Sequence, residues 1–199
     1  MNSPPPVSPP DEALASRRAD AVRNRTRVIG AAQEVFAERG IEAGIPEIAA
    51  RAGVGKGTVY RNFENKDGLV SAVLAATLDR FSESAVVALE EEDAWQAFRD
   101  LLGDAVCGKM EDGGFGMGLE LAVESEAVIT ARARASGLLA ELMEKAKDQG
   151  TMRSDLSAED AGVLFGGICR ILNERKVVDR EVWRRHSDQV ADAFRVQPS

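Results

Sequence analysis

The side chains with the most evident chemical potential are gathered between residues 56 and 66. Five polar or cationic groups follow one another closely there, on Lys56, Thr58, Tyr60, Arg61 and Asn62. Ammonium and hydroxyl groups bind phosphate oxygens, while arginine and asparagine form paired hydrogen bonds with guanine and adenine edges. Gly57 leaves room for a close backbone approach, and Lys66 adds a second ammonium. This pattern predicts contact with double-stranded DNA.

Two short helices, at 46–52 and 56–63, are expected to position these groups. In the second helix, Val59 and Phe63 lie four residues apart and turn inward, away from the polar groups. The first helix offers apolar side chains to the same core: Ile48, Ala49 and Ala52. Gly53, in the turn between the helices, supplies a backbone conformation that other residues resist. Together the two helices form a predicted helix-turn-helix.

Longer helices are expected on both sides of this pair. The preceding one begins at about residue 20 and ends before Gly40. Its apolar stripe consists of Val28, Ile29, Ala32, Val35 and Phe36. The following one runs from 66 to about 89, because Asn65 is a good N-terminal cap. Lys66 then sits where its ammonium and the helix N-terminus can hold a phosphate together.

The run VIGAAQEVFAERGIEAGIPEIAARAGVGKGTVYRNFENKDGLVSAVL closely resembles the N-terminal DNA-binding domain of TetR-family regulators. The likeness covers roughly residues 23–75. It implies a homodimer that places two recognition helices in successive major grooves of a near-palindromic operator. It also implies that two side chains contact backbone phosphates, Tyr60 and Lys66. Three others would lie near bases: Thr58, Arg61 and Asn62.

Two positions depart from the family pattern, which usually has a hydroxyl residue before each short helix. Here these positions hold Ile45 and Gly55. Loss of a capping oxygen lowers local helix stability by about 1 kcal/mol. The alternative interpretation of the segment is a small helical pair in an ordinary bundle. Glu47 and Arg51, four residues apart, are expected to be solvated or paired with each other.

The rest of the chain also predicts helices, so we expect an all-α fold of about nine. After Asp93 as a cap, the expected ranges are 94–109, 126–149, 158–174 and 179–195. A glycine-rich stretch at 111–118 is expected to be a loop that leads into a loosely wound helix ending near Glu124. The predicted domains are a disordered proline-rich tail at 1–18, a helix-turn-helix domain at 19–65, and a helical ligand-binding and dimerisation domain at 66–199.

The helix at 158–174 is apolar on nearly every side. Its apolar residues are Ala161, Val163, Leu164, Phe165, Ile168, Cys169, Ile171 and Leu172. Such a helix must be buried all round, with one flank in its own core and the other against a second subunit. Gly162 and Gly166 would allow close approach, and the last helix would add Trp183, Val190 and Phe194. The alternative is a central helix of a monomeric bundle.

The resemblance to the TetR family implies that a small-molecule effector binds in a cavity among the middle helices. Candidate lining residues are adaptable methionine, aromatic and aliphatic side chains: Trp95, Phe98, Leu102, Met110, Phe115, Met117, Leu119 and Met143. The candidate polar contacts are Glu120, Glu124 and Arg99. The alternative for each apolar residue is plain core. The resulting hypothesis is a repressor released by a small apolar ligand.

Charge and composition limit the other classes. The net charge of the 199 residues is −8. Residues 1–70 hold ten Lys and Arg against nine Asp and Glu, a net charge of +1, so the acidity belongs to the remainder. No apolar run approaches the roughly 20 residues that span a bilayer, and the N-terminus lacks the features of a secretory signal, so we expect a cytoplasmic protein without a membrane partner. Cys107 and Cys169 are expected to be buried thiols.

Catalysis has little to build on in this sequence. The single His186 cannot supply a histidine-rich metal site, and no cofactor or metal is expected. The stretch around Lys56 fails the phosphate-loop pattern, because Ala50 replaces its first glycine and Gly57 its last hydroxyl residue. The remaining rival is a helical protein-interaction module that has lost DNA binding.

Overall fold

The computed structural model describes residues 10–111 and 125–196, and its regular structure is helical. The helices are α1 (Pro10–Arg39), α2 (Ile45–Ala52), α3 (Lys56–Phe63), α4 (Lys66–Glu90), α5 (Ala94–Glu111), α7 (Glu126–Asp148), α8 (Ala158–Glu174) and α9 (Arg180–Asp192). Within these residues an isolated bridge between Met152 and Arg195 is the one extended pairing. The predicted all-α fold is confirmed. None of the described helices is long and apolar enough to cross a bilayer.

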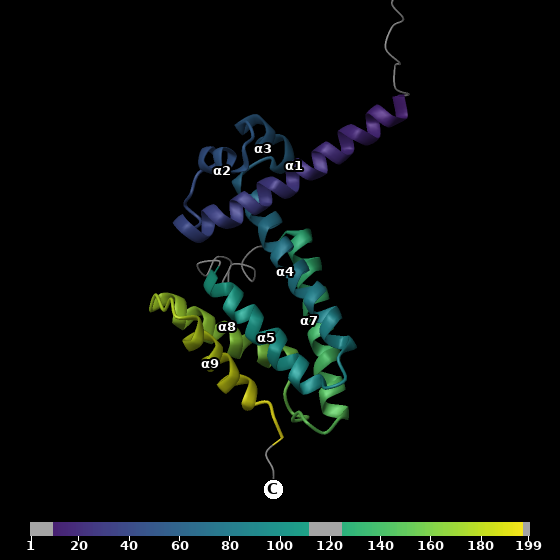
Figure 1. Cartoon of the computed structure of the whole chain (residues 1–199), viewed down its shortest axis with the longest axis vertical. Helices are drawn as coiled ribbons and strands as arrows, with labels where there is room; N and C mark the ends of the chain where they lie inside the picture. Colours follow the sequence, from purple (N-terminus) through teal and green to yellow (C-terminus); the bar gives the residue numbers. More distant parts are fainter. Residues whose placement is uncertain (1–9, 112–124, 197–199) are drawn as a thin grey trace, which may run out of the picture.

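The helices form two bodies that share α4 (Figure 1). In the smaller body, α1, α2 and α3 pack around the first turns of α4, where Leu69 and Val73 are fully buried. In the larger body, α5, α7, α8 and α9 form a second core with the last turns of α4, where Ala85 is fully buried. Helix α4 therefore belongs to both cores, and α7 also adds one residue, Val128, to the smaller one.

Part of the predicted disordered tail is helical. Helix α1 begins at Pro10, so 10–18 is helical rather than extended. Proline is favourable at the first helical position. Alanine, leucine and arginine then continue the helix at low cost. The prediction of an extended segment rested on the five prolines among the first ten residues, and 1–9 lie outside the described residues.

Several helix boundaries are as predicted. Helices α3 and α8 have the predicted limits. Asn65 and Asp93 both act as caps, since their side chains accept hydrogen bonds from Gly68 N (2.8 Å) and Gln96 N (3.0 Å). Helix α9 ends at Asp192, three residues before the expected end. The ninth predicted helix falls in 112–124, outside the described residues.

Helix α8 is two-sided, as its sequence predicted. One side, with Phe165 and Cys169, is buried in the chain's own core. The other side exposes Val163 (68%) and Ile171 (49%). A Cβ built on Gly162 or Gly166 would meet nothing within 4 Å. The chain therefore leaves one apolar side of α8 uncovered.

The expected contribution of α9 to a subunit interface is partly wrong. Trp183 and Phe194 are fully buried within the same chain. The Trp183 indole donates to Val177 O (2.8 Å), and the Phe194 ring lies 5.6 Å from that of Phe98. Large aromatic side chains bury more area than any others, and here the chain's own core takes them.

Charged side chains hold α9 against α5. The Arg184 guanidinium donates to Asp100 (2.5 Å) and Asp104 (2.9 Å), and Arg99 donates to Asp188 (3.1 Å). Gly103 leaves space for the guanidinium, since a Cβ there would lie 2.7 Å from Arg184 Cζ. Arg99, a candidate ligand contact in the sequence, is thus part of the α5–α9 packing.

Candidate nucleic-acid interface

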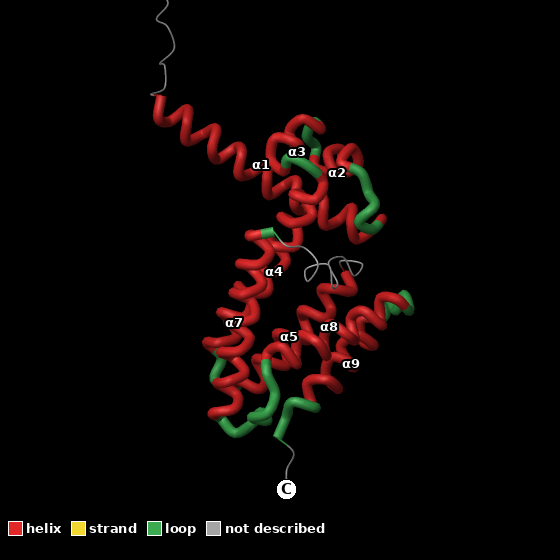
Figure 2. Tube along the Cα trace, turned by 180° about the vertical axis from the view of Figure 1, so that it is seen from behind, coloured by secondary structure: helices red, strands yellow, loops and turns green. Residues whose placement is uncertain are grey.

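Helices α2 and α3 lie at the end of the molecule opposite the C-terminus (Figure 2). Val59 (0% exposed) and Phe63 (5%) anchor α3 in the smaller core. Gly53 ends α2 with φ 64°, the left-handed conformation that the sequence required of it. The turn is therefore fixed, and α3 is held rigidly with its polar side outward.

The seven predicted DNA-contacting residues are brought together on α3 and the start of α4. Lys56, Gly57, Tyr60 and Arg61 are exposed, whereas Thr58, Asn62 and Lys66 are half-buried. Tyr60 is 50% exposed, which is unusual for an aromatic residue next to a core. The surface offers cations, hydroxyls and an amide within two helical turns, as phosphate and base-edge recognition requires.

Two of these side chains are bonded to their own helix. Arg61 donates from Nε to Gly57 O (3.0 Å) and from Nη2 to Thr58 Oγ1 (3.3 Å). Asn62 donates from Nδ2 to Thr58 O (2.7 Å). The acceptors are neutral, so a guanine edge or phosphate can replace them at little cost to Arg61. Asn62 is half-buried, which favours a structural role for its side chain.

Arg25 of α1 is a functional candidate that the sequence did not reveal. Its Nη1 donates to Asn62 O (3.0 Å), and its guanidinium lies 4.5 Å from the Phe63 ring centroid. A cation at a helix C-terminus is favourable, so Arg25 fixes the end of α3 against α1. Local periodicity carries no sign of a contact between residues 37 positions apart.

Glu47 and Arg51 are exposed, as one expected alternative had it, but they do not pair with each other. Arg51 instead pairs with Glu34 (2.9 Å) and Glu38 (2.7 Å) of α1, and Glu47 pairs with Arg39 (2.8 Å). The hydrogen bond from Arg51 lowers the pKa of Glu38 and raises the pKa of Arg51 itself. Because α2 packs across α1, these partners are nearer than the next turn of α2. The ion pairs attach α2 to α1.

The missing capping oxygens are confirmed at both short helices. Gly44 and Gly55 precede α2 and α3, and neither helix has a side-chain capping bond. Helix α2 begins at Ile45, one residue earlier than predicted, and this side chain is buried (6% exposed). The start of α2 is therefore stabilised by burial of Ile45 in the core and not by a side-chain cap.

A short turn joins α3 to α4, so only five residues separate Tyr60 from Lys66 in the sequence. Glu64 has φ 55°, in the region that a side chain disfavours. Gly68 lies so close to α3 that a Cβ there would clash with the carbonyl oxygen of Phe63. The backbone oxygen cannot move aside as a flexible side chain would.

We predict that Gly68→Ala lowers the free energy of unfolding by about 1–3 kcal/mol, although alanine is the better helix former. Gly30→Ala in α1 is the matched control, because a Cβ there meets nothing within 4 Å. It should raise stability by up to about 1 kcal/mol. Urea unfolding of both variants measures the difference. Equal stability of Gly68→Ala and the parent chain would contradict the close approach.

Comparison with known proteins gives the same assignment of the segment that contains α2 and α3. Residues 28–73 match the family described as bacterial regulatory proteins, tetR family. A TetR transcription regulatory protein from Mycobacterium vanbaalenii is 32% identical in sequence, with a TM-score of 0.64 over 90% of this chain and 99% of that one. The chain belongs to the TetR family. The TetR transcriptional regulator SCO0520 from Streptomyces coelicolor is 28% identical, with a TM-score of 0.65 over 87% of this chain and 99% of that one.

Two curated relatives of this TetR-family protein come from Pseudomonas putida. HTH-type regulator TtgW, itself called uncharacterized, is 37% identical over 89 residues, which are 44% of this chain and 66% of that protein. HTH-type regulator SrpR is also 37% identical over 89 residues, 44% of this chain and 42% of that protein. The matches thus span less than two thirds of either relative.

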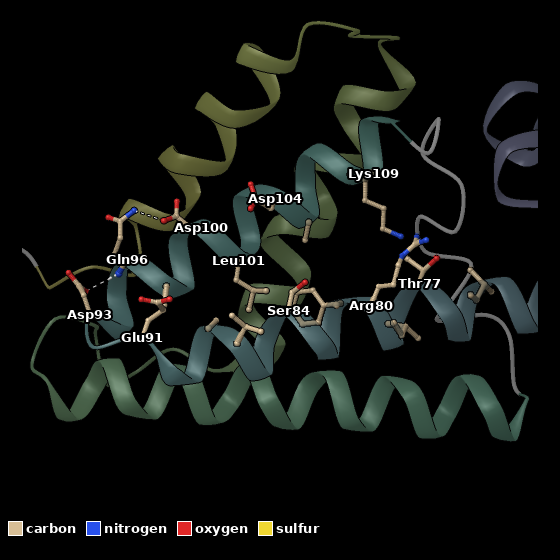
Figure 3. Close-up of a pocket in the computed structure, with 18 residues that line it drawn as sticks. Thr77, Arg80, Ser84, Glu91, Asp93, Gln96, Asp100, Leu101, Asp104 and Lys109 are labelled. Carbon is tan, nitrogen blue, oxygen red and sulfur yellow. Dashed lines mark hydrogen bonds between the residues drawn. The ribbon is translucent and has the colours of Figure 1, made fainter. Parts of the chain in front are cut away.

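The TetR-family chain has a cavity of about 760 Å³ between α4 and α5 (Figure 3). The effector residues expected from the sequence do not line it. Trp95, Phe98, Leu102 and Met143 are buried in the larger core, and Met110 packs against that core. Phe115, Met117, Leu119, Glu120 and Glu124 lie outside the described residues. The cavity instead follows the side of α5 that carries Ala97, Leu101 and Gly108.

Proposed function

We propose that the protein is a sequence-specific DNA-binding transcriptional regulator. One observation supports this most: the exposed polar side of α3, with Tyr60 and Arg61, on a helix that Val59 and Phe63 hold rigidly. In this proposal Tyr60 and Lys66 bind phosphates and Arg61 reads a base edge. The rival, a protein-interaction module without DNA binding, would need no such set of side chains.

The functional unit in this proposal is a homodimer formed through α8, with α9 beside it. The uncovered side of α8 supports it, since Val163, Leu164 and Ile171 are 68%, 43% and 49% exposed in a single chain. The neighbouring glycines let two α8 helices approach closely. Two-fold symmetry then presents two copies of α3 to the half-sites of a near-palindromic operator.

The proposed mode of action is repression that a small molecule relieves. Such a ligand acts by binding better to the conformation whose recognition helices do not fit the operator. The cavity between α4 and α5 supports this, because α4 belongs to both cores. Its volume lies within the roughly 300–1,000 Å³ of ordinary ligand pockets.

The test of DNA binding is the dependence of affinity on salt for a double-stranded operator fragment. Each lost phosphate contact should reduce the slope of log affinity against log salt by about 1, so Lys66→Gln in a dimer should reduce it by about 2. Lys147→Gln is the matched control. It removes the same charge from α7, where no DNA contact is proposed. A protein with negligible affinity at low salt, or equal slopes for the parent and Lys66→Gln, would contradict the proposal.

A further inference from the structure

Helix α1 projects well beyond the core that it helps to form. Between Arg18 and Arg27 every residue is exposed except the half-buried Asn24. Val28 is the first buried residue among the side chains described in α1. At 1.5 Å per residue, the ten residues before Val28 extend the helix by about 15 Å. We call residues 18–27 the projecting segment, and its surface is free for a partner.

The projecting segment is cationic, although the protein is acidic. It holds four arginines against one acid, Asp20, which gives it a net charge of +3, whereas the whole chain has −8. Arg23 pairs with Asp20 (2.5 Å), and both side chains are largely exposed. Arg18 and Arg27 form no ion pair within the part of the chain that the structure describes. Exposed arginines gathered along one helix are typical of a surface that binds a polyanion such as DNA.

Arg25 fixes where this segment lies. It donates to Asn62 O (3.0 Å) at the C-terminal end of α3, so α1 passes that end and continues beyond it. Figures 1 and 2 both show the start of α1 at the end of the molecule that carries α2 and α3. Seven residues are nearly two helical turns, so Arg18 lies on the same side of α1 as Arg25, about 10 Å farther along. Arg23 and Arg27, each two residues from Arg25, lie on the opposite side.

From this arrangement we infer that Arg18 binds the DNA backbone just outside the half-site that α3 reads. With α3 in the major groove, the phosphate backbone that borders the groove passes the end of α3 where Arg25 holds α1. A reach of about 10 Å from there corresponds to about three base pairs of 3.4 Å each. An α-helix about 10 Å wide does not enter a minor groove about 6 Å wide, so Arg18 meets phosphate oxygens and not base edges. This inference rests on the proposed regulator function and adds a contact outside the recognition helix.

Flanking DNA tests this contact on the full chain. An operator selected from random duplexes is trimmed to its outermost enriched base pairs and compared with the same duplex extended by about six base pairs at each end. At low salt the extension should raise the affinity of the parent protein roughly tenfold or more, because a dimer forms two additional charge pairs. Fluorescence anisotropy measures both affinities. An extension that leaves the affinity of the parent protein unchanged would overturn the inference.

Two variants of the projecting segment separate Arg18 from the general charge of the helix. Arg18→Gln should lose the gain from the extension and reduce the slope of log affinity against log salt by about 2 in a dimer. Arg27→Gln is the matched control, because it removes the same charge from the opposite side of the same helix, and it should keep the gain. Equal losses in the two variants would overturn the assignment of the contact to Arg18.

The sequence of the flank separates phosphate contact from base reading. Extensions made of A·T pairs and of G·C pairs should raise the affinity equally, and Arg18→Lys should keep the gain, since a phosphate needs only the charge. A gain from A·T flanks alone, lost in Arg18→Lys, would place Arg18 in the minor groove and overturn the phosphate contact.

The same measurements separate the inference from the proposed function. A protein that binds the trimmed operator but gains nothing from either flank would contradict the inference alone. A protein with negligible affinity for every duplex at low salt would contradict the regulator function, and the inference with it.

Discussion

Replacement of Arg61 by alanine is expected to weaken operator binding by about 1–3 kcal/mol for each half-site, and twice that for a dimer. Arg61 is exposed on α3, and its hydrogen bonds go to Gly57 O and Thr58 Oγ1 of its own helix. Its removal should therefore change the free energy of unfolding little. Fluorescence anisotropy on a selected operator gives the affinity, and thermal unfolding gives the control for stability.

Arg61→Lys separates geometry from charge at the same position. Lysine keeps the positive charge but lacks the planar fork that bonds a guanine edge twice. This variant should lose the preference for one base pair in each half-site while its affinity for unrelated DNA stays near that of the parent. Unchanged base preference in both variants would show that Arg61 does not read the sequence.

Val163→Asp is the second change with a large expected effect. Val163 is 68% exposed in the single chain, so a carboxylate there is solvated in the monomer. In a dimer through α8 the two carboxylates would be buried against each other without a partner, which costs several kcal/mol. The variant should fold as a monomer and bind the operator no better than a single half-site.

Sedimentation velocity measures the oligomeric state of this variant. Ile129→Asp is the matched control, because Ile129 is 50% exposed on α7 rather than on α8. It should remain a dimer. A dimeric Val163→Asp protein, or a monomeric parent chain at micromolar concentration, would contradict the proposed interface.

Local sequence patterns predicted α3 and α8 well. Val59 and Phe63 at a spacing of four residues, between Gly55 and Asn65, defined α3 to the residue. The apolar residues on all sides of α8 predicted both its buried side and its uncovered side. In each case the information lies within a few residues of the chain, where helical periodicity and capping act.

Contacts between distant residues were missed. Arg25 reaches Asn62, and Gln33 reaches Thr77 and Arg80, across 37 to 47 positions that no local pattern relates. Side-chain size was also misleading. Trp95 and Phe98 were expected to line a ligand pocket, but these large rings fill the core. The cavity forms where small residues such as Ala97 and Gly108 leave space.

Selection of binding sites from a random duplex library is the most direct test of the central claim that α3 reads DNA sequence. We predict enrichment of a two-fold-symmetric site whose half-sites lie about one helical turn apart, or a multiple of it. Arg61→Ala should lose this enrichment, and rising salt should weaken binding to the selected site. A library that stays unenriched, with negligible affinity even at low salt, would contradict the claim.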